Sequence, residues 1–165
     1  MKYSTQICLC LSSLCMVHTT YAITQKDVQT IAKAIGFIEG APKGDIEVAV
    51  VVDGAAGKEA ADQFITLGKE EKLTGKITSP AELSSTSAKV VYIPSGISNF
   101  DAIFSAATAK KLITISNSDA CIKAKKCAVS VNTDPKVDIT VSKSAASQTG
   151  VAFGSAFKMM IKEVD

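Results

Sequence analysis

The sequence contains no arginine and no tryptophan, and only 5% of its 165 residues are aromatic. Proteins that read nucleic acids rely on arginine side chains, stacking rings and a net basic surface. The formal net charge here is only +2. These shortages argue against nucleic-acid recognition, and the sequence predicts no nucleic-acid partner. The 47% hydrophobic and 21% charged content instead fits a globular protein with a real core.

The first 22 residues have the layout of a signal peptide. Lys2 precedes an apolar run at 7–17, and small residues at the −3 and −1 positions point to cleavage after Ala22. The sequence therefore predicts a cleaved signal at 1–22 and a mature periplasmic domain at 23–165. After cleavage that domain would not span the membrane.

Two alternatives to a cleaved signal fit the sequence less well. A membrane anchor is the first, but the run at 7–17 would cover only about 16 Å as a helix, roughly half of the hydrocarbon core. A lipoprotein acylated at Cys15 is the second. The preceding residue is Leu14, whereas a small residue normally stands there.

Cleavage would also remove most of the reactive side chains. His18 is the single histidine, and three of the five cysteines (Cys8, Cys10 and Cys15) lie in the same segment. A chain without histidine lacks the commonest general base and the commonest zinc ligand. We therefore expect no catalytic residues, no metal and no cofactor, and we expect that the protein is not an enzyme.

Hydrophobic periodicity predicts an α/β fold made of one domain, an open mixed sheet flanked by helices. Apolar and β-branched runs predict strands at 46–52, 73–78, 89–93 and 112–116, with helices or turns between them. Helix signals cover 25–38, 57–67 and 80–83, and an apolar face begins at Phe100. Such alternation indicates parallel βα units with right-handed crossovers.

In the C-terminal third, apolar and polar residues alternate strictly along two segments. Segments 128–132 and 136–142 predict an antiparallel hairpin with one wet face. Ser130, Asn132, Asp138 and Thr140 would occupy that wet face. Two helical pieces are expected on either side of Gly150, the second lined by Phe157, Met160, Ile161 and Val164.

Local signals predict where three of the helices begin or end. Thr24 with Asp27 three residues later predicts a capping box. Gly68 is expected as the left-handed residue just after the second helix. Ser98 is expected to cap the next helix, with Asp101 at its third position.

Cys121 and Cys127 would be the two cysteines left in the mature chain. Three of the five residues between them are lysine. Export favours a structural disulfide, which would close a seven-residue loop. A redox-responsive pair is the alternative, because neighbouring lysines can lower a thiol pKa. A metal site is disfavoured without histidine.

Two loops that follow predicted strands are candidate ligand-facing segments. Asp53-Gly54 ends the first strand, and Pro94-Ser95-Gly96 ends the third. Ligands bind outside the carboxyl ends of strands in open α/β sheets, so Asp53, Gly54, Ser95 and Gly96 could line one cleft. The alternative is that these residues only form turns. No G-x-S-x-G motif surrounds Ser95, so the sequence does not indicate a nucleophile.

The C-terminal residues resemble the YfiR-like family of bacterial periplasmic proteins. The run at 112–116 (LITIS) is similar to that family's strand-loop motif, and the run at 139–142 (ITVS) begins a segment similar to its ending. Ala145-Ala146, Gly150-Val151, Phe153 and Ser155 continue the likeness. The sequence departs from the family at three places. The family's tryptophan is missing around Gly40-Ala41, and Lys125-Lys126-Cys127 stands where the family often has two glycines. Asp138 stands where the family has arginine.

This resemblance implies a non-enzymatic regulator that inhibits an inner-membrane diguanylate cyclase in c-di-GMP signalling. It also implies that the state of the Cys121–Cys127 pair tunes the inhibition by shifting an equilibrium between conformations or oligomers, of which a homodimer is one. A small-molecule-binding module associated with a transporter is the alternative function, for which the two strand-end loops would form the site.

Overall fold

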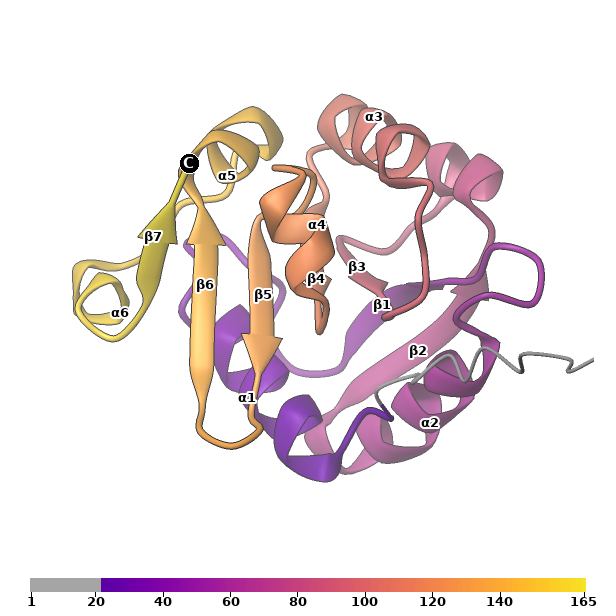
Figure 1. The fold of residues 1–165 in the computed structure, drawn as a ribbon, viewed down its shortest axis with the longest axis horizontal. Coiled ribbons are helices and arrows are strands. Elements are labelled where there is room, and N and C mark those ends of the chain that lie inside the picture. The colour runs from indigo at the N-terminus through magenta and orange to yellow at the C-terminus, as the bar shows by residue number, and fades with distance from the viewer. Residues whose placement is uncertain (1–21) are drawn as a thin grey trace, which may run out of the picture.

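The computed structural model describes residues 22–165, which form a seven-stranded sheet in the order β2-β1-β3-β4-β5-β6-β7. Strands β7 and β2 lie at opposite edges (Figure 1). All neighbours pair in parallel except β5 and β6, which pair antiparallel. The strands are β1 Ile46–Val51, β2 Leu73–Thr78, β3 Val90–Ile93, β4 Ile113–Ser116, β5 Val129–Asn132, β6 Asp138–Ser142 and β7 Lys162–Val164. The predicted α/β class with a C-terminal antiparallel hairpin is confirmed.

Helices cover both faces of this sheet, so it has two apolar cores. Strand β1 shows the division most clearly, since Val48 and Val50 belong to one core and Ala49 and Val51 to the other. Burial on both faces is what its near-continuous β-branched sequence predicts. The helices are α1 Gln25–Gly36, α2 Lys58–Gly68, α3 Phe100–Lys110, α4 Asp119–Lys123, α5 Lys143–Thr149 and α6 Ser155–Lys158, with 3-10 turns η1 Lys69–Glu71 and η2 Pro80–Ser85.

Helices α1 and α2 contribute to one core, and α3, α4 and η2 to the other. Within residues 22–165, none of the helices has the length and apolar character that crossing a bilayer requires. The predicted signal peptide lies outside the described residues, apart from Ala22.

Helix α1 begins as its sequence predicts. Thr24 is the N-cap, and its hydroxyl accepts a hydrogen bond from the Asp27 N–H. The Asp27 carboxylate in return accepts from the Thr24 N–H at 2.8 Å. This reciprocal pair satisfies N–H groups that a helix start leaves without intrahelical partners. The capping box is therefore confirmed.

The other two predicted helix boundaries are wrong. Gly68 has a right-handed conformation (φ −64°) and ends α2, and the left-handed residue is Lys72. Glycine is needed at 68 for space, because an added Cβ would lie 2.9 Å from the Leu73 carbonyl oxygen. Ser98 does not cap α3, whose N-cap is Asn99. The chain is held before that point by Ile97, which is buried in the core.

The C-terminal residues form a strand where the sequence predicts a helix. Helix α6 ends at Lys158, and Lys162–Val164 pair in parallel with β6 as β7. Pairing satisfies backbone groups along the edge of β6, and this non-local gain outweighs the local helical pattern. Met160, expected inside, is 62% exposed.

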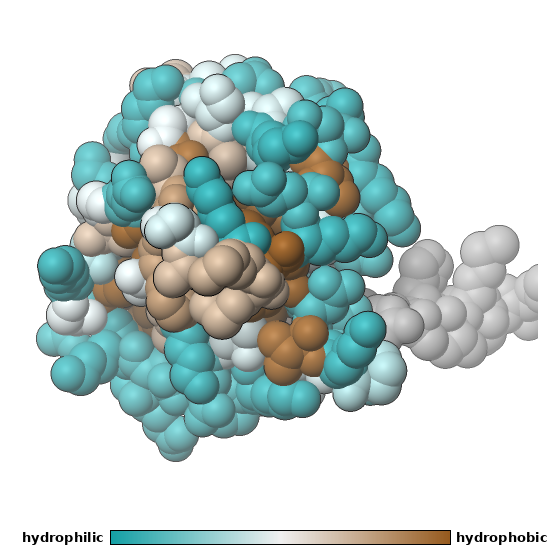
Figure 2. All heavy atoms as spheres, turned by 90° about the vertical axis from the view of Figure 1, so that its left-hand side faces the viewer, coloured by the Kyte–Doolittle hydropathy of each residue, from teal (hydrophilic) through white to brown (hydrophobic). Residues whose placement is uncertain are grey.

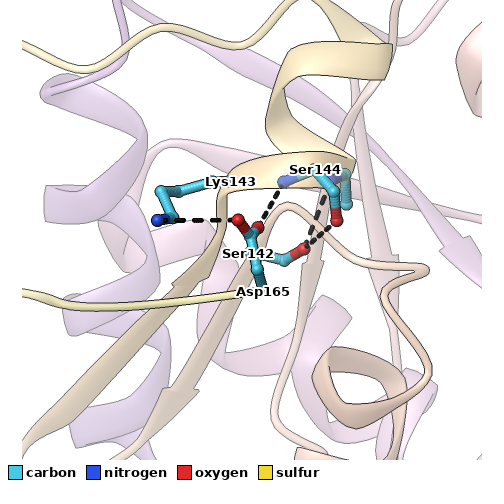
Figure 3. Close-up of polar contacts among 5 residues, drawn as sticks. Ser142, Lys143, Ser144 and Asp165 are labelled. Carbon is cyan, nitrogen blue, oxygen red and sulfur yellow. Dashed lines mark hydrogen bonds and ion pairs between the residues drawn. The ribbon is translucent and has the colours of Figure 1, made fainter.

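Asp165 fastens the end of β7 to helix α5. Its carboxylate accepts a hydrogen bond from the Ser144 N–H at 3.0 Å and lies 3.5 Å from Lys143 Nζ (Figure 3). The Ser142 hydroxyl caps α5 beside it, accepting from the Ala145 N–H. Strand β7 is thus held both by pairing with β6 and by its last residue.

The wet face predicted for the hairpin is only partly present. Asn132 and Asp138 are exposed, as expected. Ser130 is only 2% exposed, because α4 packs over β5. The prediction is therefore wrong for Ser130, which lies beneath a helix that the strand pattern does not indicate.

Candidate functional site

Two cavities lie side by side where the parallel strands end. Strands β1, β3, β4 and β5 run in the same direction, so the loops after them meet at one edge of the sheet. One cavity has a volume of about 360 Å³ and the other about 270 Å³. Ser95 and Ala22 line both. The carboxyl edge is where open α/β sheets bind ligands, so these adjoining cavities are the candidate site.

The larger cavity has an acidic wall. Three aspartates line it, and among the described residues no lysine does so. Amide and hydroxyl groups make up most of the remaining polar surface. The acidic and amide side chains of the lining are Asp27, Asp119, Asp134, Asn117 and Asn132. A wall of this composition suits a ligand that carries a positive charge or several hydrogen-bond donors.

Asp27 ties this wall to helix α1. One carboxylate oxygen accepts from the Thr24 N–H and from the Thr24 hydroxyl, the latter at 2.7 Å. The other accepts from the Thr133 hydroxyl at 2.7 Å. Asp27 is only 8% exposed, so the helix cap also joins α1 to the loop after β5. Lys26 adds a second link by donating to the Thr133 carbonyl oxygen at 3.3 Å.

A serine and asparagine network holds the loops after β3 and β4 together. The Ser95 N–H donates to the Asn117 side-chain oxygen at 2.9 Å. Ser116 is fully buried, donates to the Ile93 carbonyl oxygen and accepts from the Ser118 N–H. Side-chain hydrogen bonds thus hold the ends of β3 and β4 together at this edge of the sheet.

Tyr92 lies in the core beneath this edge. Its ring stacks on Phe64 with 4.3 Å between centroids. Its hydroxyl has no hydrogen-bond partner among the residues of the structure. Burial, and secondarily the negative charge of Asp27, raises the pKa of Tyr92 well above its usual value. The phenol therefore stays neutral and packs as an apolar ring.

The smaller cavity is formed by the start of helix α2. Gly57 is the N-cap with φ 77°, and it provides no side-chain cap for the first turn. Lys58, Glu59 and Gln63 line the cavity with it. The N-terminus of a helix carries partial positive charge on its N–H groups and attracts anions. The N–H groups at this end of α2 suit a carboxylate, although Glu59 and the pairing of Lys58 Nζ with Asp62 at 3.4 Å limit the net positive charge.

The structure brings some of the predicted ligand-facing residues into this site. Ser95 lies in both cavities and Gly96 in the smaller one. Asp53 and Gly54 instead form the tight turn after β1, in which the Asp53 N–H donates to the Ala56 carbonyl oxygen. It is the continuation of that loop, residues 55–57, that lines the smaller cavity.

Sequence reasoning missed most of the acidic wall. Asn117 follows β4 directly, and Thr133 and Asp134 follow β5. Polar residues directly after predicted strands are the sequence feature that indicates this wall. The alternating pattern predicts the hairpin, but it does not indicate that the residues after β5 line a cavity. Asp27 was recognised only as a capping residue, since nothing local indicates that β5 ends next to α1.

Cys121 and Cys127 form a disulfide, as the sequence predicts. Both cysteines are fully buried in the core to which α3 and α4 contribute, and Cys121 is itself a residue of α4. The side chains of Lys123 and Lys125 are exposed, and Lys126 is engaged with Asp101 at 2.8 Å. Burial of the sulfurs away from solvent favours the structural reading over the redox-responsive one.

Replacing both cysteines with alanine is expected to lower the free energy of unfolding by about 2 kcal/mol. The bridge closes a seven-residue loop, and the chain-entropy model gives this value for a loop of that length. Urea denaturation of the oxidised protein and of the C121A/C127A variant measures the difference. A matched control is wild-type protein reduced under native conditions. If reduction leaves stability unchanged while the variant is destabilised, cavity formation rather than cross-linking is responsible.

Comparisons with known proteins show the fold and no more. The chain matches no family model and no curated protein. It is similar to the crystal structure of an ABC domain from Streptococcus pneumonia in complex with L-Trp, at 12% identity and a TM-score of 0.63. It is also similar to a conserved domain protein from Vibrio cholerae O1 biovar El Tor, at 15% identity and 0.59. The chain is covered to 86% in both cases and spans 61% and 60% of those chains.

Proposed function

We propose that this protein is a binding module for a small zwitterionic molecule of the amino-acid type. The observation that carries the proposal is the pair of adjoining cavities that share Ser95. The acidic wall around Asp119 and Asp134 suits an ammonium group, and the uncapped start of α2 beside Lys58 suits a carboxylate. The L-Trp complex of the similar ABC domain supports this choice of ligand class.

Binding is tested with thermal-shift and calorimetric titrations of the mature chain. The panel contains the common amino acids, polyamines, nucleotides and inorganic anions. We expect a saturable shift with one or more amino acids, a smaller one with the matching decarboxylated amine, and none with anions alone. A response only to nucleotides, or none to any member of the panel, would contradict the proposal.

Replacing Asp134 with alanine is expected to weaken amino-acid binding by about tenfold. Charge-assisted hydrogen bonds are worth about 1.5–3 kcal/mol, and tenfold corresponds to 1.4 kcal/mol. Asp134 is exposed, so stability should change little. Asp45 is also exposed and lies just before β1, at the end of that strand away from the cavities, so D45A is the matched control. Equal affinities for the two variants would show that Asp134 does not bind the ligand.

A regulatory function is the second candidate, and an exposed apolar patch favours it. Phe37, Val137, Met159 and Met160 are exposed hydrophobic residues, with Met159 84% exposed. Figure 2 shows apolar residues gathered on the left-hand side of the view in Figure 1, ringed by hydrophilic ones. Methionine-rich surfaces adapt to protein partners. In this function the protein would be a periplasmic YfiR-like regulator contacting an inner-membrane protein such as a diguanylate cyclase.

The regulatory candidate is tested by capture from detergent-solubilised membranes. Mature protein and an M159S/M160S variant are used as baits, each with and without reductant. The candidate predicts that an inner-membrane signalling enzyme is retained by the wild type and lost with the variant. Recovery of no inner-membrane protein by the wild type, in either redox state, would count against it.

A further inference from the structure

The predicted cleavage point lies inside the candidate site. Ala22 lines both cavities, together with Ser95. Ile23, the next residue, is only 4% exposed and belongs to the core that includes Val28 and Tyr92. The chain therefore passes from the junction of the cavities directly into a fixed position in the core.

Cleavage after Ala22 would change this junction in two ways. It would remove Ala22 from the walls of both cavities. It would also turn the Ile23 amide into an α-ammonium group, which is charged at pH 7. The Thr24 N–H lies 2.8 Å from an Asp27 oxygen, and one residue of backbone adds at most about 4.3 Å, which places the new ammonium within roughly 7 Å of that oxygen.

The ammonium would be held in place by groups that do not depend on residues before it. The Ile23 side chain is buried, and both the N–H and the hydroxyl of Thr24 bond to Asp27. Among residues 22–165, the donors that hydrogen-bond to the Asp27 carboxylate are the neutral groups of Thr24 and Thr133. A positive charge beside it would gain a favourable interaction in a partly buried setting.

We propose that removal of residues 1–22 completes the binding site, and that the Ile23 α-ammonium becomes one of its ligand-binding groups. This inference rests on the proposed amino-acid-binding function. The ammonium at the junction, the uncapped start of α2 and Lys58 would together receive the ligand carboxylate. Asp119 and Asp134 would receive the ligand amine farther along the acidic wall. Removal of residues 1–22 during export would thereby make the protein able to bind its ligand.

The test compares four forms of the chain. The first is the uncut chain 1–165, and the second is the 23–165 form released from a fusion so that Ile23 is its first residue. The third is a 22–165 form that retains Ala22 and shifts the ammonium by one residue. The fourth is the 23–165 form with an acetylated Ile23, which removes the charge with little added bulk. Each is titrated calorimetrically with the amino acids of the panel, and its folding is checked by circular dichroism.

The inference predicts at least tenfold tighter amino-acid binding by the free 23–165 form than by the other three. The acetyl group takes the place of the Cα and carbonyl group of Ala22 and carries no charge, so loss of affinity for this form shows that binding requires a free Ile23 ammonium. Equal binding by all four forms would overturn the inference while leaving the proposed function intact. Absence of binding by every correctly folded form would overturn both. Tight binding by the acetylated form but not by 22–165 would overturn the role of the ammonium and retain only that of Ala22.

Discussion

Replacing Phe64 with alanine is expected to lower the free energy of unfolding by about 3–5 kcal/mol. Phe64 projects from α2 into the core, is fully buried and stacks on Tyr92 with ring planes 15° apart. The change removes the apolar area of the ring, the aromatic contact and the support beneath β3. Urea denaturation followed by far-UV circular dichroism measures the loss.

The matched control is Phe64→Leu, which keeps most of the side-chain volume. It is expected to lose clearly less stability than the alanine variant, since volume-conserving apolar changes are tolerated best. An alanine variant as stable as the leucine variant would mean that this core collapses around the space. The packing described between α2 and β3 would then be wrong.

Replacing Asp27 with alanine is expected to lower the free energy of unfolding by about 2–3 kcal/mol. Loss of the capping interaction accounts for about 1 kcal/mol. Loss of the bond to Thr133 adds a further penalty, because that hydroxyl belongs to a residue only 6% exposed and would be left without its acceptor. Denaturant titration at neutral pH measures the total.

The contribution of the cap is separated from that of the link to β5 with two companion variants. Thr133→Val removes the link and keeps the cap, whereas Thr24→Ala removes the cap hydroxyl and keeps the link. Each should be less destabilising than Asp27→Ala. If Thr133→Val has no effect, the Asp27–Thr133 bond does not fasten the loop after β5, and the rigidity of the acidic wall needs another explanation.

Features that depend on neighbouring residues could be predicted from the sequence. The box made by Thr24 and Asp27 involves residues three apart, so the pattern contains the whole interaction. The β-branched run of β1 predicted a strand buried on both faces, because no polar side alternates along it. The expectation of export, together with only two cysteines beyond residue 22, was enough to favour a bridge between Cys121 and Cys127.

Features that depend on the close approach of distant segments could not be predicted from the sequence. Whether Gly68 serves a turn or a tight contact depends on Leu73 coming within van der Waals range. Residues 162–164 form a strand because β6 offers an unpaired edge, a circumstance that their own periodicity does not show. The burial of Ser130 likewise depends on α4 crossing β5.

In the candidate site too, some features could be predicted from the sequence and others depend on the tertiary structure. Sequence alone determined the layered α/β architecture, and with it the expectation that Ser95 and Gly96 lie at an edge suited to ligands. Only the tertiary structure placed Asp27, Asn117 and Asp134 around one cavity and Ala22 at its junction with another. The physical reason is that a parallel sheet brings together strand ends that lie far apart in the chain. Local patterns fix which residues end each strand, but the order of strands in the sheet decides which of those ends become neighbours.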